Sequence, residues 1–209
     1  MNIRTIALLI LTTTLIQDRT ANAAAFVQWP VASGGNGHFY AVTDSALTWT
    51  AAESVAISLG GHLVSITSAA EQTFITTTFL NGAFDFRPLW IGLTDLAPNG
   101  GGAGSRIYTR WTTGENVVYT NWNNAEPNNT SPGEDYGTMN WQRANGEVTP
   151  KGTWNDTPNS GTTFGPVGPY FGIVEVVQIV PEPSSTLFLL SGAALCLRRR
   201  TLRTNEPNG

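Results

Sequence analysis

Oxygen-bearing side chains crowd two short stretches of the sequence, NNAEPNNTSPGEDYG at residues 123–137 and GTWND at residues 152–156. The carboxylates and amides that could meet at one cation are Glu126, Asn128, Glu134, Asn155 and Asp156. Calcium takes about six to eight oxygen ligands, whereas zinc and softer metals favour Cys and His, which both stretches lack. The set therefore indicates a calcium site, and the alternative is a solvated surface loop that holds no metal.

The spacing of these residues is compatible with a single ion. Glu126 and Asn128 are two positions apart, so an extended backbone would direct both side chains to one face. The five side chains leave room at calcium for about two or three further oxygens. We do not expect a second ion on Asp135 and Asn129, because an amide is a weaker ligand than a carboxylate.

The composition predicts a loop-rich globular domain that can build a core. The chain of 209 residues is 41% hydrophobic, with seven Trp and nine Phe, but it also contains 22 Gly and 12 Pro. Between positions 24 and 179, five basic residues stand against twelve acidic ones, a net charge of −7. Such a charge repels phosphate backbones, so we do not expect nucleic acid as a partner, and a divalent cation is favoured.

The N-terminal segment has the pattern of an export signal. Arg4 precedes an apolar run at 6–16, and the small residues of Ala21-Asn22-Ala23 form a signal-peptidase site. We expect residues 1–23 to be a signal peptide that signal peptidase removes, so that the protein is exported. The alternative is a buried N-terminal helix.

The C-terminal segment 180–209 is expected to be a second sorting signal. Val180-Pro181-Glu182-Pro183-Ser184 is followed by an apolar stretch at 186–197 and then by Arg198, Arg199 and Arg200. This stretch is shorter than the roughly 20 residues of a membrane-spanning helix. The order resembles the PEP-CTERM sorting signal of Gram-negative bacteria. That resemblance implies processing by an exosortase, only transient contact with the membrane, and delivery to the cell surface or the extracellular polysaccharide matrix. A simple tail anchor is the alternative.

The middle of the chain predicts an α+β domain. A helix is expected at 47–59, ended by Gly60-Gly61, and a second helix is expected to open with an S-x-x-E capping box at Ser68 and Glu71. Strands are expected at 63–66, 89–93 and 171–177, with a glycine-rich flexible loop at 97–104. We therefore expect a small antiparallel sheet, with function placed on loops.

The motifs resemble those of C-type lectin domains. LWIGLTD at 89–95, the triplet Glu126-Pro127-Asn128, GEDYGTMN at 133–140, GTWND and GIVEV occur in the family's order, and the resemblance covers about residues 39–177. It implies a C-type lectin-like fold over a domain at 26–179, with two helices, small antiparallel sheets and a long loop region.

This chain departs from the family in its cysteines. The family usually has four, at places that correspond to Ala56, Tyr136, a residue near Asn159, and Val174. The sole cysteine of this chain is Cys196, within the tail. Both family bridges are thus missing together, and the domain contains no disulfides.

The resemblance also implies a ligand. In the family the bond before the proline is cis, so we expect a cis Glu126–Pro127 bond. Glu126 and Glu134 would accept hydrogen bonds from sugar hydroxyls, and the amides of Asn128 and Asn155 would donate to them. The E-P-N triplet goes with mannose/glucose-type saccharides, whereas Q-P-D, which goes with galactose, is lacking here.

Other functions remain open at this point. A protein-binding adhesion or scaffold domain, with a structural calcium or none, is the main alternative, because a fold does not decide function. An enzyme is not expected, although formylglycine-generating enzymes have a related fold, because those enzymes need active-site cysteines. Glu126 and Glu134 would form the acid and base pair of a glycosidase only if no metal were bound.

Overall fold

The computed structural model describes residues 25–130 and 133–178, so the expected signal peptide at 1–23 and tail at 180–209 lie outside the described residues. In the described part, the elements along the chain are β1 (Val27–Gln28), η1 (Val31–Ser33), β2 (Phe39–Val42), α1 (Trp49–Ser58), β3 (His62–Leu63), α2 (Ala69–Phe79), η2 (Gly82–Phe84), β4 (Leu89–Thr94), β5 (Tyr136–Met139), α3 (Trp141–Ala144), β6 (Trp154–Thr157) and β7 (Phe171–Val176). Among the described residues, no helix combines the length and the apolar composition that crossing a bilayer requires.

The two long helices begin as the sequence predicts. Thr48 Oγ1 accepts from Ala51 N at 3.3 Å at the start of α1, and Ser68 Oγ accepts from Glu71 N at 3.1 Å at the start of α2. The second half of the expected capping box differs. The Glu71 carboxylate accepts from Thr67 N at 2.8 Å and from Tyr40 Oη at 2.8 Å, because the buried Tyr40 hydroxyl offers it a donor in the core.

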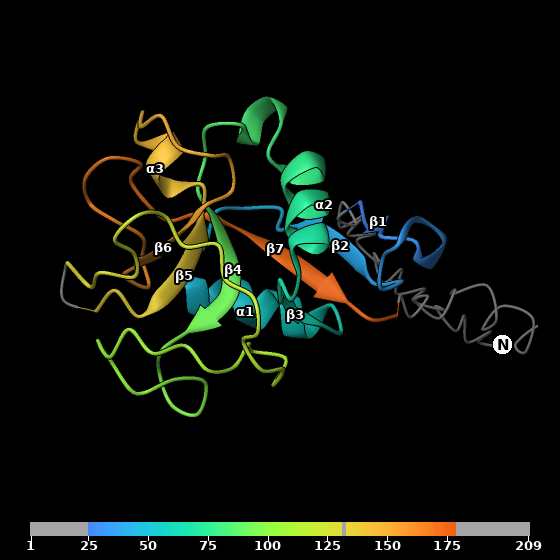
Figure 1. Ribbon diagram of the computed structural model, residues 1–209, viewed down its shortest axis with the longest axis horizontal. Helices are drawn as coiled ribbons and strands as arrows, with labels where there is room; N and C mark the ends of the chain where they lie inside the picture. Colours follow the sequence, from blue (N-terminus) through green and yellow to red (C-terminus); the bar gives the residue numbers. More distant parts are fainter. Residues whose placement is uncertain (1–24, 131–132, 179–209) are drawn as a thin grey trace, which may run out of the picture.

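The sheet confirms the α+β class. Its strand order is β1-β2-β7-β4-β5-β6, with β3 paired to β7. The β4–β7 pairing is parallel, with Leu89 opposite Phe171 and Trp90 opposite Gly172, so the sheet is mixed rather than purely antiparallel. The chain returns after the long loop region and inserts β7 between β2 and β4, where it runs in the direction of β4 (Figure 1).

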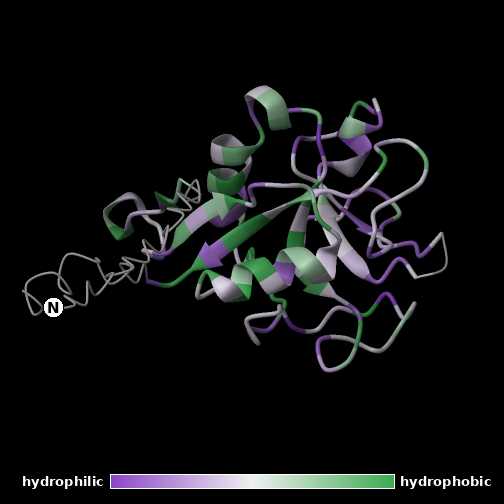
Figure 2. Cartoon of the chain, turned by 180° about the vertical axis from the view of Figure 1, so that it is seen from behind, coloured by the Kyte–Doolittle hydropathy of each residue, from purple (hydrophilic) through white to green (hydrophobic). Residues whose placement is uncertain are grey.

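Strand β7 has an apolar contact on each of its faces. Ile173 belongs to the cluster that contains Ile75 and Phe79 of α2, whereas Val174 and Val176 pack in a cluster with Ala56 of α1. The two helices therefore cover opposite faces of this strand, which is coloured mainly as hydrophobic (Figure 2). Alternation along a strand produces such a pattern, because successive side chains point to opposite faces.

Non-covalent contacts occupy the places of the missing cysteines. Ala56 and Val174 are both fully buried in one cluster. The Tyr136 ring lies 4.9 Å from that of Trp49, and Asn159 Oδ1 accepts from Thr50 N at 3.0 Å in the first turn of α1. Apolar packing, a ring contact and a helix cap thus involve the positions at which the family usually has cysteines.

Restoring one bridge tests this arrangement. The double variant Ala56→Cys/Val174→Cys, made with Cys196→Ser, should form a disulfide under oxidising conditions. It should stabilise the folded state by about 2–4 kcal/mol relative to the reduced protein, because it constrains a long loop of the unfolded chain. Chemical denaturation with and without reductant measures the difference, and each single cysteine variant is the control. Thiols that stay unpaired in the folded, oxidised protein would show that the two positions do not face each other.

Candidate functional site

Strand β6 is the anchor of the candidate site. Trp154 is fully buried, its indole ring lies 5.6 Å from that of Trp111 and 5.7 Å from that of Trp122, and its Nε1 donates to Gln72 Oε1 at 2.8 Å. The next two residues, Asn155 and Asp156, are opposite Thr138 and Gly137 of β5. The tryptophan therefore fixes the strand position from which the two predicted ligands project.

The Glu126-Pro127-Asn128 loop is bound directly to that strand. The Glu126–Pro127 peptide bond is cis, as expected. The carboxylate of Asp156 accepts from Asn128 N at 3.1 Å through Oδ1 and from Asn129 N at 2.9 Å through Oδ2. Asp156 is fully buried, and charge-assisted hydrogen bonds of this kind are stronger than neutral ones.

Glu126 is the acid of the site whose pKa is raised most. Burial, followed by the neighbouring Asp156 and the charge of Glu134, raises the pKa of Glu126 from 4.5 to about 8. Its Oε1 accepts from Asn128 Nδ2 at 3.0 Å and from Gln142 Nε2 at 3.1 Å, but its Oε2 is buried without a hydrogen-bond partner. Crowded carboxylates with an unpartnered buried oxygen fit a divalent cation, which stabilises their charged forms.

The two amides of the predicted set are turned toward protein groups. Asn128 Oδ1 accepts from Thr130 N at 2.8 Å and from Thr130 Oγ1 at 2.5 Å. Asn155 Oδ1 accepts from Gln142 Nε2 at 2.7 Å, while its Nδ2 donates to Asp156 O at 2.6 Å. Both amide oxygens are thus engaged within the protein.

The structure therefore gathers most of the predicted set into one network. Hydrogen bonds connect Glu126, Asn128, Asn155 and Asp156, and buried Glu134 acts on them through its charge. Within the described part of the chain, no three His, Cys, Asp or Glu side chains converge on one point in a way that could hold a metal. The residue types fit calcium, and amide rotation would be needed for the asparagine oxygens to face an ion.

A neighbouring acidic pair holds the glycine-rich segment. Asp95 Oδ2 accepts from Arg106 N at 3.0 Å, and Asp135 Oδ1 accepts from Gly104 N at 2.7 Å. Burial raises the pKa of Asp95, and the charge of Asp135 raises it further. The segment at 97–104, expected as a flexible loop, is therefore tied down by carboxylates and contacts Asn129, whose Nδ2 donates to Gly104 O at 3.4 Å.

Sequence reasoning missed two residues near the site, Asp95 and Gln142. Asp95 closes the LWIGLTD motif and could have been noticed as a buried acid that follows an apolar strand. Gln142 sits in a stretch with no recognisable motif, so no sequence signal marks it. Both are buried and both make contacts that define the neighbourhood of the predicted ligands.

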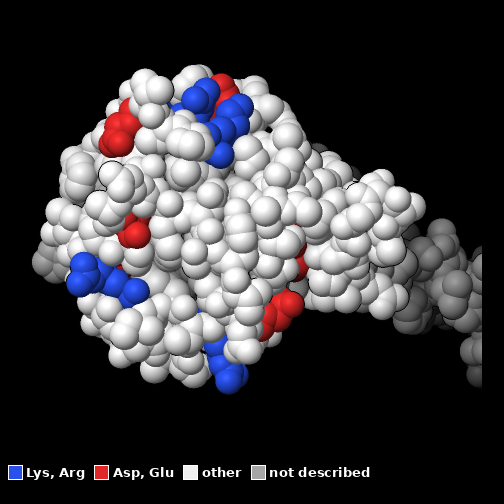
Figure 3. Space-filling model, in the orientation of Figure 1, with Lys and Arg blue, Asp and Glu red and all other residues white. Residues whose placement is uncertain are grey.

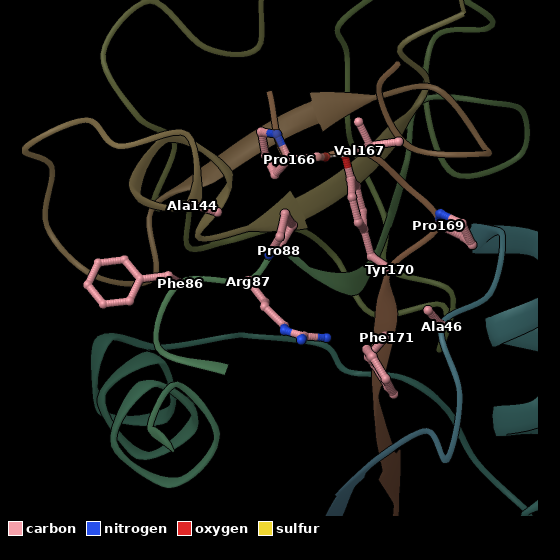
Figure 4. Close-up of a pocket in the computed structure, with 10 residues that line it drawn as sticks. All are labelled: Ala46, Phe86, Arg87, Pro88, Ala144, Pro166, Val167, Pro169, Tyr170 and Phe171. Atoms are coloured by element: carbon pink, nitrogen blue, oxygen red, sulfur yellow. Dashed lines mark hydrogen bonds between the residues drawn. The ribbon is translucent and has the colours of Figure 1, made fainter. Parts of the chain in front are cut away.

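A surface pocket of about 300 Å³ shares helix α3 with this site (Figure 4). Ala144 of α3 lines the pocket together with proline and aromatic side chains, and Arg87 is the charged residue among its lining residues. None of the five predicted ligands lines it. The pocket is separate from the candidate cation site, and it offers no carboxylate to an ion. Charged side chains are also sparse on the face shown in Figure 3.

A comparison with known families identifies the family of this domain. Residues 45–161 match the model described as the Lectin C-type domain. The chain belongs to the C-type lectin domain family. The E-P-N loop, the buried W-N-D strand and the acids between them all lie within the matched region.

Relatives and solved structures agree with the assignment. Human C-type mannose receptor 2 is 33% identical over 142 residues, which cover 68% of this chain and 8% of the receptor. Ladderlectin of Oncorhynchus mykiss is 31% identical over 121 residues, 58% of this chain and 56% of that protein. The chain thus spans less than two thirds of these relatives. The crystal structure of the C-type lectin CEL-I from Cucumaria echinata is 27% identical with a TM-score of 0.51, over 66% of this chain and 89% of that one.

The pH dependence of folding stability, measured in the presence of a chelator, tests the raised pKa of Glu126. The raised pKa of Glu126, about 8 against 4.5, means that the folded domain keeps a proton that the unfolded chain releases. The stability contribution is fully present below the unfolded pKa of 4.5 and is lost as the pH rises toward 8. Glu126→Gln cannot titrate, so its melting temperature should fall less over this range than that of the unmodified protein. The exposed Glu147→Gln is the control, and equal losses in all three proteins would contradict the assignment.

Proposed function

We propose that this domain is a calcium-dependent carbohydrate-binding module for mannose/glucose-type saccharides. The observation that carries the proposal is the buried network in which Asp156 holds the Glu126-Pro127-Asn128 loop while one oxygen of Glu126 has no partner. The chain belongs to the C-type lectin domain family. In that family context, the unpartnered oxygen of Glu126 beside Asp156 supports an ion that binds both the E-P-N loop and the W-N-D strand.

Five residues would hold the calcium ion, namely Glu126, Asn128, Glu134, Asn155 and Asp156. They supply three carboxylates and two amide oxygens, a hard ligand set that matches calcium rather than zinc. Bound calcium would supply an open coordination position for sugar hydroxyls. The cysteine-free sequence of the described domain leaves loop order to hydrogen bonds and to the ion.

Recognition of the sugar would come from the same side chains. Glu126 and Glu134 would accept hydrogen bonds from two neighbouring hydroxyls, and the amides of Asn128 and Asn155 would donate to them. This donor and acceptor order supports equatorial 3- and 4-hydroxyls, as in mannose and glucose. The name of the human relative, a mannose receptor, is in keeping with this class of ligand.

A protein-binding scaffold domain is the second candidate. The observation that favours it is that the oxygens of Asn128 and Asn155 already accept hydrogen bonds from Thr130 and Gln142. In that case the network would only stiffen the loop, and the partner surface would lie elsewhere. Such a domain keeps its partner in chelator, whereas the proposed lectin releases its sugar. Neither candidate assigns a catalytic step to the site.

We also propose where the lectin acts. The export pattern at 1–23 and the PEP-CTERM-like order at 180–209 support delivery to the surface or the polysaccharide matrix of a Gram-negative bacterium. Signal peptidase and an exosortase would be the partners during export, with membrane contact limited to that passage. A matrix location would supply saccharide chains at high local density, where weak single sites gain by multivalency.

Calcium should stabilise the protein. Adding Ca²⁺ should raise the melting temperature, because an ion that binds only the folded state stabilises it, by about 2.7 kcal/mol at one hundred times its dissociation constant. Asp156→Asn should remove most of this rise, since it deletes a charge at nearly constant shape. Differential scanning fluorimetry measures both, with the exposed Asp44→Asn as control. An unchanged melting temperature at millimolar calcium would refute the ion site.

The sugar preference should follow the order of donors and acceptors. A glycan array should show binding to mannose/glucose-type sugars that disappears in chelator. The double variant Glu126→Gln/Asn128→Asp keeps one carboxylate but reverses the pairing, so its preference should move toward galactose. Each mismatched buried polar group costs about 1–3 kcal/mol. Galactose binding by the unmodified protein, or mannose binding that survives chelation, would overturn the assigned specificity.

A further inference from the structure

Helix α3 places a buried amide between the two halves of the site. Gln142 is 2% exposed, and its Nε2 donates to Asn155 Oδ1 at 2.7 Å and to Glu126 Oε1 at 3.1 Å. One nitrogen thus joins the E-P-N loop to the W-N-D strand. Gln142 Oε1 is also buried, and it has no hydrogen-bond partner.

The position of Gln142 is set by the two residues before it. Asn140 is fully buried, with a positive φ of 70°, and its Nδ2 donates to Asp85 O at 3.0 Å and to Arg87 O at 3.2 Å. Trp141 Nε1 donates to Thr162 Oγ1 at 3.2 Å. These anchors involve neither Glu126 nor Asn155, so the protein holds the Gln142 backbone independently of the candidate ligands.

We propose that Gln142 is a positioning residue that fixes the spacing of the E-P-N loop and the W-N-D strand before any ion is bound. Both acceptors are oxygens, one from the loop and one from the strand. The two N–H groups of one planar amide satisfy both at once, and they define the separation of the loop and the strand. Gln142 in this way supplies loop order that the family obtains from disulfides. Its consequence for calcium affinity rests on the proposed function, whereas its effect on the loop does not.

The substitution Gln142→Met tests this role. Gln142→Met keeps the length and the flexibility of the side chain and removes both donors. The matched control is Thr43→Val, because Thr43 is also buried and its Oγ1 donates to Ser45 O at 2.8 Å and accepts from Gly172 N at 3.0 Å, away from the candidate site. Thr43 bonds to neither Glu126 nor Asn155, and its hydrogen bonds do not involve Trp154.

The first readout is hydrogen exchange of the full chain in chelator, where calcium plays no part. The amides of Asn128 and Asn129, which donate to Asp156, should exchange at least severalfold faster in Gln142→Met than in the unmodified protein. Exchange in β4 and α1 should stay unchanged in the same sample. Thr43→Val should leave the exchange of the loop unaltered. Loop exchange at the unmodified rate in Gln142→Met would overturn the positioning role.

The second readout is the dissociation constant for calcium, measured by titration calorimetry. Loss of the two hydrogen bonds should weaken calcium binding about tenfold in Gln142→Met, and calcium binding should be unchanged in Thr43→Val. Tighter binding in Gln142→Met would show that this amide competes with the ion, and it would overturn the proposal. If the unmodified protein binds no calcium but loop exchange still accelerates in Gln142→Met, the proposed function fails and the positioning role stands.

Discussion

The carboxylate of Asp156 is the interaction on which the candidate site depends. It is buried at the centre of a short strand, and each of its oxygens accepts a backbone N–H from the loop that carries Glu126 and Asn128. Because a buried carboxylate must be compensated, these two hydrogen bonds hold the loop against the strand. The tryptophan before it, surrounded by other rings, keeps the strand from shifting. Any ion or sugar that binds here would meet a loop that this side chain holds against the strand, together with the amide of Gln142.

The same site brings negatively charged side chains close together, and this favours the binding of a cation. Glu126 lies close enough to Asp156 and Glu134 for their charges to raise its pKa, and one of its oxygens is buried without a partner. A divalent cation would convert the repulsion between these carboxylates into attraction, and this is the physical argument behind the proposed calcium site.

Local signals in the sequence predicted much of this architecture. The cap at Ser68, which joins residues three positions apart, was expected from the S-x-x-E motif, and a helix was expected at 47–59. The cap at Thr48 was not predicted. The cis bond before Pro127 was expected from the family resemblance, and the structure confirms it. The parallel pairing of β4 with β7 could not be predicted in this way, because it joins residues about eighty positions apart and depends on where the closing strand inserts.

The contacts within the site were harder to predict than its residues. The five ligand candidates were evident from oxygen chemistry, but the bridge made by Gln142 required the three-dimensional course of α3, a helix of one turn with no periodic pattern. The glycine-rich segment likewise had the composition of a flexible loop, yet the distant Asp135 accepts from Gly104 N, and Asp95 accepts from Arg106 N just beyond the segment. Composition reports the freedom of an isolated segment, whereas buried charge elsewhere in the chain decides how much of that freedom remains.

The central claim is that one calcium ion joins the loop to the strand, and a crystal structure of the protein grown with calcium tests it most directly. The account predicts a single ion bound by oxygens of Glu126, Glu134 and Asp156 at about 2.3–2.6 Å, with the amides of Asn128 and Asn155 turned to present oxygen. A structure grown at millimolar calcium that shows no ion between these residues, with Asn128 still bonded to Thr130, would contradict it.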